Sequence, residues 1–272
     1  MKITILNENT VYKRGLLAEH GLSLYIECHG KKILFDVGQS DVFIRNAKTL
    51  GVDLQNLDAV VLSHGHYDHC GGMEALVKEI ELPKVYITKK AFETKKNRNP
   101  DGVTYRDIGI DWDKSLLGDN VVEVEEKYEI SKGIYLLQGI PYTNDFEEPG
   151  KGLMVWRDGE LKTDRMEDEQ ILVVEEGDGL FVFLGCSHPG IINALNYVKT
   201  NFPGKKIRSL FAGMHLKGAA NQRLERTFDE LEQFDIELMM PVHCTGQEAI
   251  VRMKRRFPSQ CRIVTCGEVI EI

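Results

Sequence analysis

The stretch "VVLSHGHYDHCGG", residues 60–72, holds three histidines and an aspartate within six consecutive positions. The whole chain has only 8 histidines in 272 residues, so this density is unusual. Residues at i and i+2 of an extended backbone project to one side, so His64 and His66 can bind one cation together. The glycines of the stretch let the chain turn, so that Asp68 and His69 face a neighbouring point. The stretch therefore predicts a metal site.

The ligand types narrow the chemistry of that site. Imidazole suits zinc, iron, nickel and copper, whereas a carboxylate adds hard-ligand character. Two cations about 3.5–4 Å apart are typical of a hydrolytic pair.

Composition and charge exclude several classes of protein. The formal charge is −8, from 34 Lys and Arg against 42 Asp and Glu, which disfavours a nucleic-acid partner. The start, "MKITILNENT", has an apolar run that is too short for a secretory signal. No stretch approaches the roughly 20 apolar residues of a membrane span. We therefore expect a cytoplasmic protein with no membrane partner. The six cysteines are scattered without a C-x-x-C pair, which favours buried thiols over a disulfide framework.

Alternating strand and helix patterns run through both halves of the chain. The first half predicts a hairpin over "LSLYIEC" and "KKILFDVG", a helix over 41–52 and a buried strand over 58–63 that ends at the histidine cluster. The second half predicts a hairpin over 170–186, then helices and strands in turn, and a last strand over "RIVTC", residues 262–266. Thr245 and Glu248 have the spacing of a capping box for the last helix. This order fits two sheets covered by outer helices, an α+β fold.

Residues 89–164 carry weaker signals. Long irregular segments in compact domains are usually functional, so this segment is predicted to be an insertion that forms a lid and much of the substrate pocket. Its basic residues could contact a substrate phosphate, but a solvated face is the more common outcome. The residues concerned are Lys89, Lys90, Lys95, Lys96 and Arg98.

Three further histidines follow strand-like runs. His188, His215 and His243 come directly after such runs and before helices, where function is found in open α/β sheets. A histidine of the core would more often lie inside an apolar pattern. For His20, in "AEHG", a role in the pocket and a structural role with a hydrogen bond are equally favoured. Cys70 adjoins His69, and a packed thiol is favoured over a metal ligand there.

The H-x-H-x-D-H pattern after a hydrophobic strand, with later histidines at strand ends, resembles the metallo-β-lactamase superfamily. The resemblance covers nearly the whole chain. It implies a four-layer αββα sandwich formed by 1–272 as one domain, with 89–164 inserted into it. It also implies that a first metal is bound by His64, His66 and His188, and a second by Asp68, His69 and His243. The element "ILFDVGQS" matches a superfamily element and makes Asp36 a residue that supports a ligand.

Shorter matches resemble one subgroup of that superfamily. "GCSHPGI", "GMHL" and "PVHCTG" are similar to proteins named for 7,8-dihydropterin-6-methyl-4-(β-D-ribofuranosyl)aminobenzene-5′-phosphate synthase, which implies a phosphorylated, pterin-related substrate. One departure concerns the acidic residue that usually bridges the two metals. The region expected to supply it is "FAGMHLKG", which has His215 instead. We expect His215 to face an anionic substrate rather than to join both metals, because a neutral imidazole offers one lone pair per nitrogen.

Together these features predict a metal-dependent hydrolase with a binuclear centre of zinc, or alternatively manganese or iron. Such metals lower the pKa of a bound water from about 15.7 to about 7. Asp68 and His215 are the predicted catalytic residues. The expected partner is a small-molecule anionic substrate, first a phosphate ester and second a lactone or thioester. The alternative of another class is a non-catalytic sensor that keeps the site for metal or ligand binding.

Overall fold

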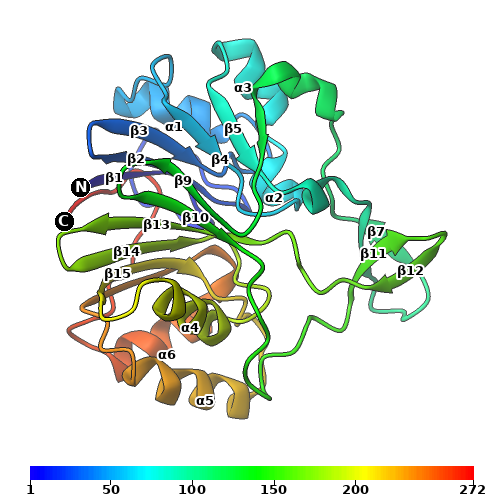
Figure 1. Ribbon diagram of the computed structural model, residues 1–272, viewed down its shortest axis with the longest axis vertical. Helices are drawn as coiled ribbons and strands as arrows, with labels where there is room; N and C mark the ends of the chain where they lie inside the picture. The colour runs from blue at the N-terminus through cyan, green and yellow to red at the C-terminus, as the bar shows by residue number, and fades with distance from the viewer. The chain divides into compact units, whose positions relative to one another are not determined.

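The computed structural model describes residues 1–272, which form two compact units. Unit 1 consists of Met1–Val124, Gly150–Asp168 and Thr265–Ile272. Unit 2 consists of Glu125–Pro149 and Glu169–Val264. Each unit is built on one large β-sheet (Figure 1).

The large sheet of unit 1 has seven strands in the order β17-β1-β2-β3-β4-β5-β8. Its first strands pair antiparallel, whereas β3, β4, β5 and β8 run parallel to one another. The strands are β1 (Lys2–Asn7), β2 (Ser23–Cys28), β3 (Lys31–Phe35), β4 (Ala59–Val61), β5 (Lys84–Ile87), β8 (Val121–Glu123) and β17 (Val269–Glu271). The two ends of the chain therefore meet, because β17 pairs with β1.

Two amphipathic helices pack on this sheet, α1 (Val42–Leu50) and α3 (Met73–Glu79) (Figure 1). Phe43 and Ala47 of α1 and Met73 and Leu76 of α3 belong to one buried cluster with the apolar side chains of the parallel strands. The helix α1 ends at Gly51, which has a left-handed conformation (φ 70°). Its backbone amide donates to the carbonyls of Ala47 and Lys48 in the last turn. The short helix α2 (Tyr67–Cys70) lies between them in the chain, directly after the histidine-rich loop.

A smaller sheet of unit 1 has four strands in the order β12-β11-β6-β7. They are β6 (Lys95–Arg98), β7 (Tyr105–Asp107), β11 (Leu153–Arg157) and β12 (Glu160–Thr163). Two 3₁₀ helices, η1 (Lys89–Phe92) and η2 (Lys114–Asn120), lie in the same part of the chain. Residues 89–164 thus supply the small sheet, the edge strand β8 of unit 1, and the first two strands of unit 2.

The sheet of unit 2 has six strands in the order β16-β15-β14-β13-β10-β9. They are β9 (Lys127–Ser131), β10 (Ile134–Gln138), β13 (Gln170–Glu176), β14 (Gly179–Leu184), β15 (Lys206–Gly213) and β16 (Leu238–Val242). Strands β14, β15 and β16 are parallel neighbours, so their carboxyl ends lie at one edge. The helices are α4 (Ile191–Asn201), α5 (Asn221–Glu232), α6 (Gln247–Arg256) and the 3₁₀ helix η3 (His243–Thr245) (Figure 1). The apolar faces of α4, α5 and α6 share one buried cluster with β13, β14 and β15.

Most elements predicted from the sequence are confirmed, and two predictions are wrong. The last strand is Val269–Glu271 rather than 262–266, of which Ile263 is 47% exposed. Thr245 does not cap α6, because its hydroxyl donates to the Ala212 carbonyl and accepts from the Met214 amide, while Gly246 occupies the cap position. No helix is both long enough and apolar enough to cross a lipid bilayer.

Candidate metal centre

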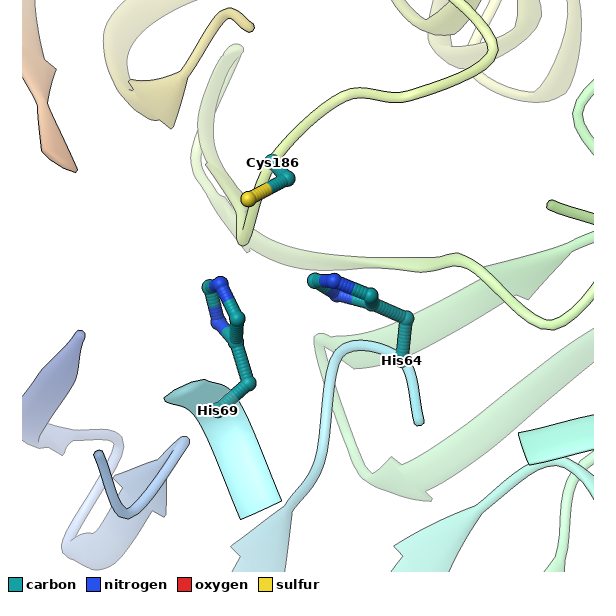
Figure 2. Close-up of side chains that lie close together, drawn as sticks. All are labelled: His64, His69 and Cys186. Carbon is teal, nitrogen blue, oxygen red and sulfur yellow. The ribbon is translucent and has the colours of Figure 1, made fainter. Parts of the chain in front are cut away.

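The histidine-rich loop of unit 1 begins where the buried strand β4 ends. His64, His66, Asp68 and His69 are all buried. Nε2 of His64 lies 3.0 Å from Nδ1 of His66, within hydrogen-bond distance. The ring centroids of His64 and His69 lie 4.3 Å apart, and Figure 2 shows the two rings rising from the loop and from α2. The side chains of the i, i+2 pair therefore lie together, and their binding of one cation stays a prediction.

Gly65 lets this loop lie directly against the backbone of η1. A Cβ atom at that position would meet the Ala91 carbonyl oxygen at 2.0 Å, so only glycine fits. The amide of Gly65 donates to Oδ2 of Asp168 at 2.8 Å. This contact fixes the backbone between the two histidines.

Asp36 supports the loop from the end of β3. Its backbone is left-handed (φ 58°), and its buried carboxylate accepts from the Ser63 amide at 2.7 Å and the Ser63 hydroxyl at 2.8 Å. The same carboxylate lies 2.6 Å from Nδ1 of His69. Because an ionised carboxylate only accepts, Nδ1 of His69 carries the proton and Nε2 keeps the lone pair that a metal needs.

A buried ion cluster lies behind the loop. Lys95 is 1% exposed, and its ammonium lies 2.7 Å from Asp164 and 2.9 Å from Asp168. Burial alone would lower the pKa of Lys95, but the charges of Asp168 and Asp164 outweigh it and raise that pKa above its ordinary value. The prediction of a solvated basic face is therefore wrong for Lys95. Burial, and next the charge of Lys95, lower the pKa of His66 to about 3, which keeps its imidazole neutral.

His20 and Asp68 form a pair at the more open side of the loop. Nε2 of His20 lies 3.2 Å from Oδ2 of Asp68, and the side chain of His20 is 47% exposed while that of Asp68 is 11% exposed. The sequence favoured a pocket role and a structural role for His20 equally. In the structure His20 contacts Asp68. Cys70 is a packed thiol as predicted, because it donates to the His64 carbonyl and burial raises its pKa.

The second group of candidate ligands lies at the strand ends of unit 2. Each of the three parallel strands is followed by a residue in the left-handed conformation, namely Ser187 (φ 54°), His215 (φ 47°) and His243 (φ 51°). Such conformations are costly for residues other than glycine and occur often at functional sites. They turn the chain sharply after each strand. Figure 2 labels Cys186 on the turn after β14.

These turns bring nitrogen and sulfur donors together. Possible ligand atoms of Cys186, His188 and His215 lie within 4.8 Å of one another, and so do those of Cys186, His243 and Cys244. The rings of His188 and His215 have centroids 4.4 Å apart. His188 and His243 are buried, whereas His215 is exposed, so His215 is no core histidine.

A buried carboxylate also supports this second group. Glu169 accepts hydrogen bonds from the amides of Cys186 at 3.3 Å, Ser187 at 2.5 Å and His188 at 2.6 Å. Glu169 is not among the site residues predicted from the sequence. The available signal was the acidic run "EDE" directly before the buried strand "QILVV", where a charge is costly unless it accepts several hydrogen bonds. Cys186 and Cys244 were not predicted as site residues either. The available signal was their position close to the candidate ligands His188 and His243 in the sequence.

The thiols of the chain fall into two kinds. Burial raises the pKa of Cys261 to about 11 and that of Cys266 to about 12. Burial acts in the same direction on Cys244, but its contacts with Cys186 and His215 hold the pKa of this thiol well below its usual range. The donors at the strand ends are thus imidazoles and thiols, a set that suits zinc, iron or copper better than magnesium or calcium.

Imidazole-rich loops at the ends of buried strands, supported by buried carboxylates, form candidate metal-binding groups in an α+β protein. The chain belongs to the metallo-β-lactamase superfamily, since the model of that family matches residues 18–243. The fold class predicted from the sequence is confirmed by this match.

Individual relatives agree with the family. The crystal structure of Tm1679, a metal-dependent hydrolase of the β-lactamase superfamily, is 33% identical, with a TM-score of 0.86 over 100% of this chain and 99% of the other. A Methanocaldococcus jannaschii protein without an assigned function is 35% identical over 93% of this chain and 94% of its own length. The 7,8-dihydropterin-6-methyl-4-(β-D-ribofuranosyl)-aminobenzene-5′-phosphate synthase of the same organism is 28% identical over 98% of this chain and 95% of its length. The chain therefore has the fold of a superfamily of metal-dependent hydrolases.

Proposed function

We propose that the protein is a metal-dependent hydrolase that uses two cations, zinc in preference to manganese or iron, on a small anionic substrate. The observation that carries this proposal is the arrangement of unit 1. Nε2 of His64 lies 3.0 Å from Nδ1 of His66, and the contact of Asp36 with Nδ1 of His69 leaves Nε2 of that ring available to a metal. Neutral imidazole is the form that binds metal, and the lowered pKa of His66 supplies it.

The allocation of ligands follows the resemblance to the superfamily. His64, His66 and His188 would hold the first cation, and the second would be held by Asp68, His69 and His243. This allocation goes with the prediction that 1–272 form one domain into which 89–164 are inserted. When bound, the cations supply a water of lowered pKa and polarise the bond that is cleaved.

The remaining steps belong to side chains of the chain. Asp68 would accept a hydrogen bond from the attacking water, and His20, 3.2 Å away, would orient its carboxylate. His215 would contact the anionic group of the substrate or protonate the leaving group, since its reference pKa of about 6.5 permits both states. Its exposure suits a residue that meets a substrate.

A phosphate ester is the proposed substrate class, and a pterin-related one is favoured. The support is the 28% identity to a synthase whose name includes a 5′-phosphate, together with the short motifs shared with that subgroup. Lactones and thioesters are the second choice. A cytoplasmic location is kept as part of this proposal.

The test combines metal analysis with a panel of substrates. The wild type, grown with added zinc, is expected to purify with close to two equivalents of metal, and His64→Ala should remove at least one. His29→Asn is the matched control, because His29 lies in an exposed turn with φ 50°, a conformation that asparagine tolerates. A wild type without metal would refute the proposal.

Turnover is the second measurement. Asp68→Asn should abolish hydrolysis of any phosphate ester that the wild type cleaves, because the amide lacks the charge of the carboxylate. Metal without turnover across phosphate esters, phosphodiesters, lactones and thioesters would instead support the alternative of a metal or ligand sensor.

A further inference from the structure

Cys186 and Cys244 lie at the ends of two strands that are not neighbours. Cys186 follows β14 and Cys244 follows β16, and β15 lies between these strands in the sheet. Strands separated by one neighbour are about 9.6 Å apart, twice the usual spacing. The two sulfur atoms nevertheless lie within 4.8 Å of each other, and Sγ of Cys244 lies 3.5 Å from the Cys186 carbonyl oxygen.

Gly213, the last residue of β15, makes this approach possible. A Cβ atom there would lie 2.2 Å from the Gly185 carbonyl oxygen and 2.7 Å from Sγ of Cys244. Any side chain at this position would therefore stand between the two strand ends. The glycine leaves the space over the end of β15 to the two thiols.

The same space receives a ring nitrogen of His243. Possible ligand atoms of Cys186, Cys244 and His243 all lie within 4.8 Å of one another, and all three residues are buried. Tetrahedral zinc with Zn–S of about 2.3 Å and Zn–N of about 2.0 Å places its ligand atoms about 3.3–3.8 Å apart. Small side-chain rotations would bring the three atoms to that spacing.

The surroundings suit sulfur that carries negative charge. The amide of His215 donates to Sγ of Cys244 at 3.3 Å. The turn that carries Cys186 is fixed by Glu169, and the turn that carries Cys244 is fixed by the two hydrogen bonds of Thr245. Fixed turns of this kind hold ligands ready to bind.

The other four cysteines differ from this pair. None of Cys28, Cys70, Cys261 and Cys266 belongs to a group of three potential ligands. Cys70 and Cys266 donate to backbone carbonyls, as Cys244 does to the Cys186 carbonyl, so the difference lies in the neighbouring ligand atoms. The sequence also has His215 where the resemblance implies a bridging carboxylate, which leaves Asp68 as the one anionic ligand assigned to the second cation.

We propose that Cys186 and Cys244 are metal ligands, and that with His243 they form a sulfur-containing site for one zinc-type cation. Two thiolates supply the charge that the absent carboxylate would have supplied, and they select soft or borderline cations over magnesium, calcium and manganese. The inference rests on the proposed function in one respect, the assignment of His243 to the second cation.

Cobalt substitution tests the inference without relying on activity. The wild type loaded with Co²⁺ should show a thiolate-to-cobalt charge-transfer band in the near ultraviolet. Cys186→Ser and Cys244→Ser should each weaken this band, and the double variant should lose it. Cys28→Ser, at another buried cysteine, is the matched control and should leave the band unchanged.

X-ray absorption at the zinc edge gives a second measurement that needs no variant. Zinc bound to the wild type should show a sulfur shell at about 2.3 Å beside nitrogen at about 2.0 Å. Bound zinc with only nitrogen and oxygen neighbours, and bound cobalt without the band, would overturn the sulfur ligands and leave the proposed hydrolase intact. A wild type that binds neither metal would overturn both proposals.

Discussion

The loop of unit 1 and the strand ends of unit 2 are each supported by a buried carboxylate, but the two carboxylates act on different atoms. Asp36 reaches the ring of His69 at Nδ1, so it fixes the tautomer and the direction of the ligand atom. Glu169 accepts hydrogen bonds from the backbone amides of Cys186, Ser187 and His188, so it fixes the turn. In unit 1 a carboxylate fixes the direction of a ligand atom, whereas in unit 2 a carboxylate fixes the backbone of the turn.

The two regions also differ in charge. The loop of unit 1 has the carboxylates of Asp36, Asp68 and Asp168 around it, with Lys95 as the buried counter-charge. The strand ends of unit 2 present imidazoles and thiols, and the carboxylate of Glu169 accepts from the backbone amides of their first turn. Substitutions in unit 1 should therefore remove charge compensation, and substitutions in unit 2 should remove hydrogen bonds.

The largest effect is expected from Lys95→Met. This change leaves Asp164 and Asp168 buried without their cation, which typically costs about 3–5 kcal/mol of the free energy of unfolding. Urea denaturation of the metal-free variant measures it. Lys96→Met is the control, because Lys96 pairs at the surface with Asp107, which is 77% exposed, and such pairs contribute about 0–1 kcal/mol. Equal losses in the two variants would show that the buried cluster has no special weight.

A smaller effect, on metal binding, is expected from Asp36→Asn. Asparagine tolerates the left-handed backbone at this position, and its oxygen can still accept from Ser63. Its amide group cannot serve as the acceptor for both Ser63 and His69, so Nε2 of His69 loses its fixed direction. Loss of such a partner typically lowers metal affinity about 10–100-fold. Competition with a chromophoric chelator measures this, and unchanged affinity would mean that the ring is held by other contacts.

Local patterns predicted much of the fold and of unit 1's site. The strand over 58–63 ends at the histidine cluster, as Ala59–Val61 does in the structure, because burial and ligand spacing are both written within a few residues. The helix over 41–52 was predicted for the same reason, since its apolar positions and its terminal glycine are local signals.

The failures all depend on partners that lie far away in the chain. Lys95 sits in a basic run, and only its pairing with Asp164 and Asp168, 69 and 73 residues later, makes it a buried residue. Thr245 has capping-box spacing, but its hydroxyl bonds to Ala212 of the neighbouring strand β15 and to Met214 just beyond that strand. The last strand depends on pairing between residues 269–271 and β1 at the other end of the chain. No local pattern records such contacts.

The smallest effect is expected from Glu169→Gln, and its character matters more than its size. The amide oxygen can accept from part of the cluster of three backbone amides, but the NH₂ group cannot accept, so at least one buried N–H loses its partner. A buried donor left unsatisfied costs about 1–3 kcal/mol, so we expect a loss at the lower end of that range in the free energy of unfolding. Hydrogen exchange should quicken at the amides of Ser187 and His188, because the turn itself is loosened. The control is Glu167→Gln, at a half-exposed carboxylate paired with Arg157, which should change neither quantity by more than the roughly 0–1 kcal/mol of a surface pair. Reduced metal affinity in Glu169→Gln without faster hydrogen exchange would contradict this role, because it would show that Glu169 acts on the ligand atoms and not on the backbone.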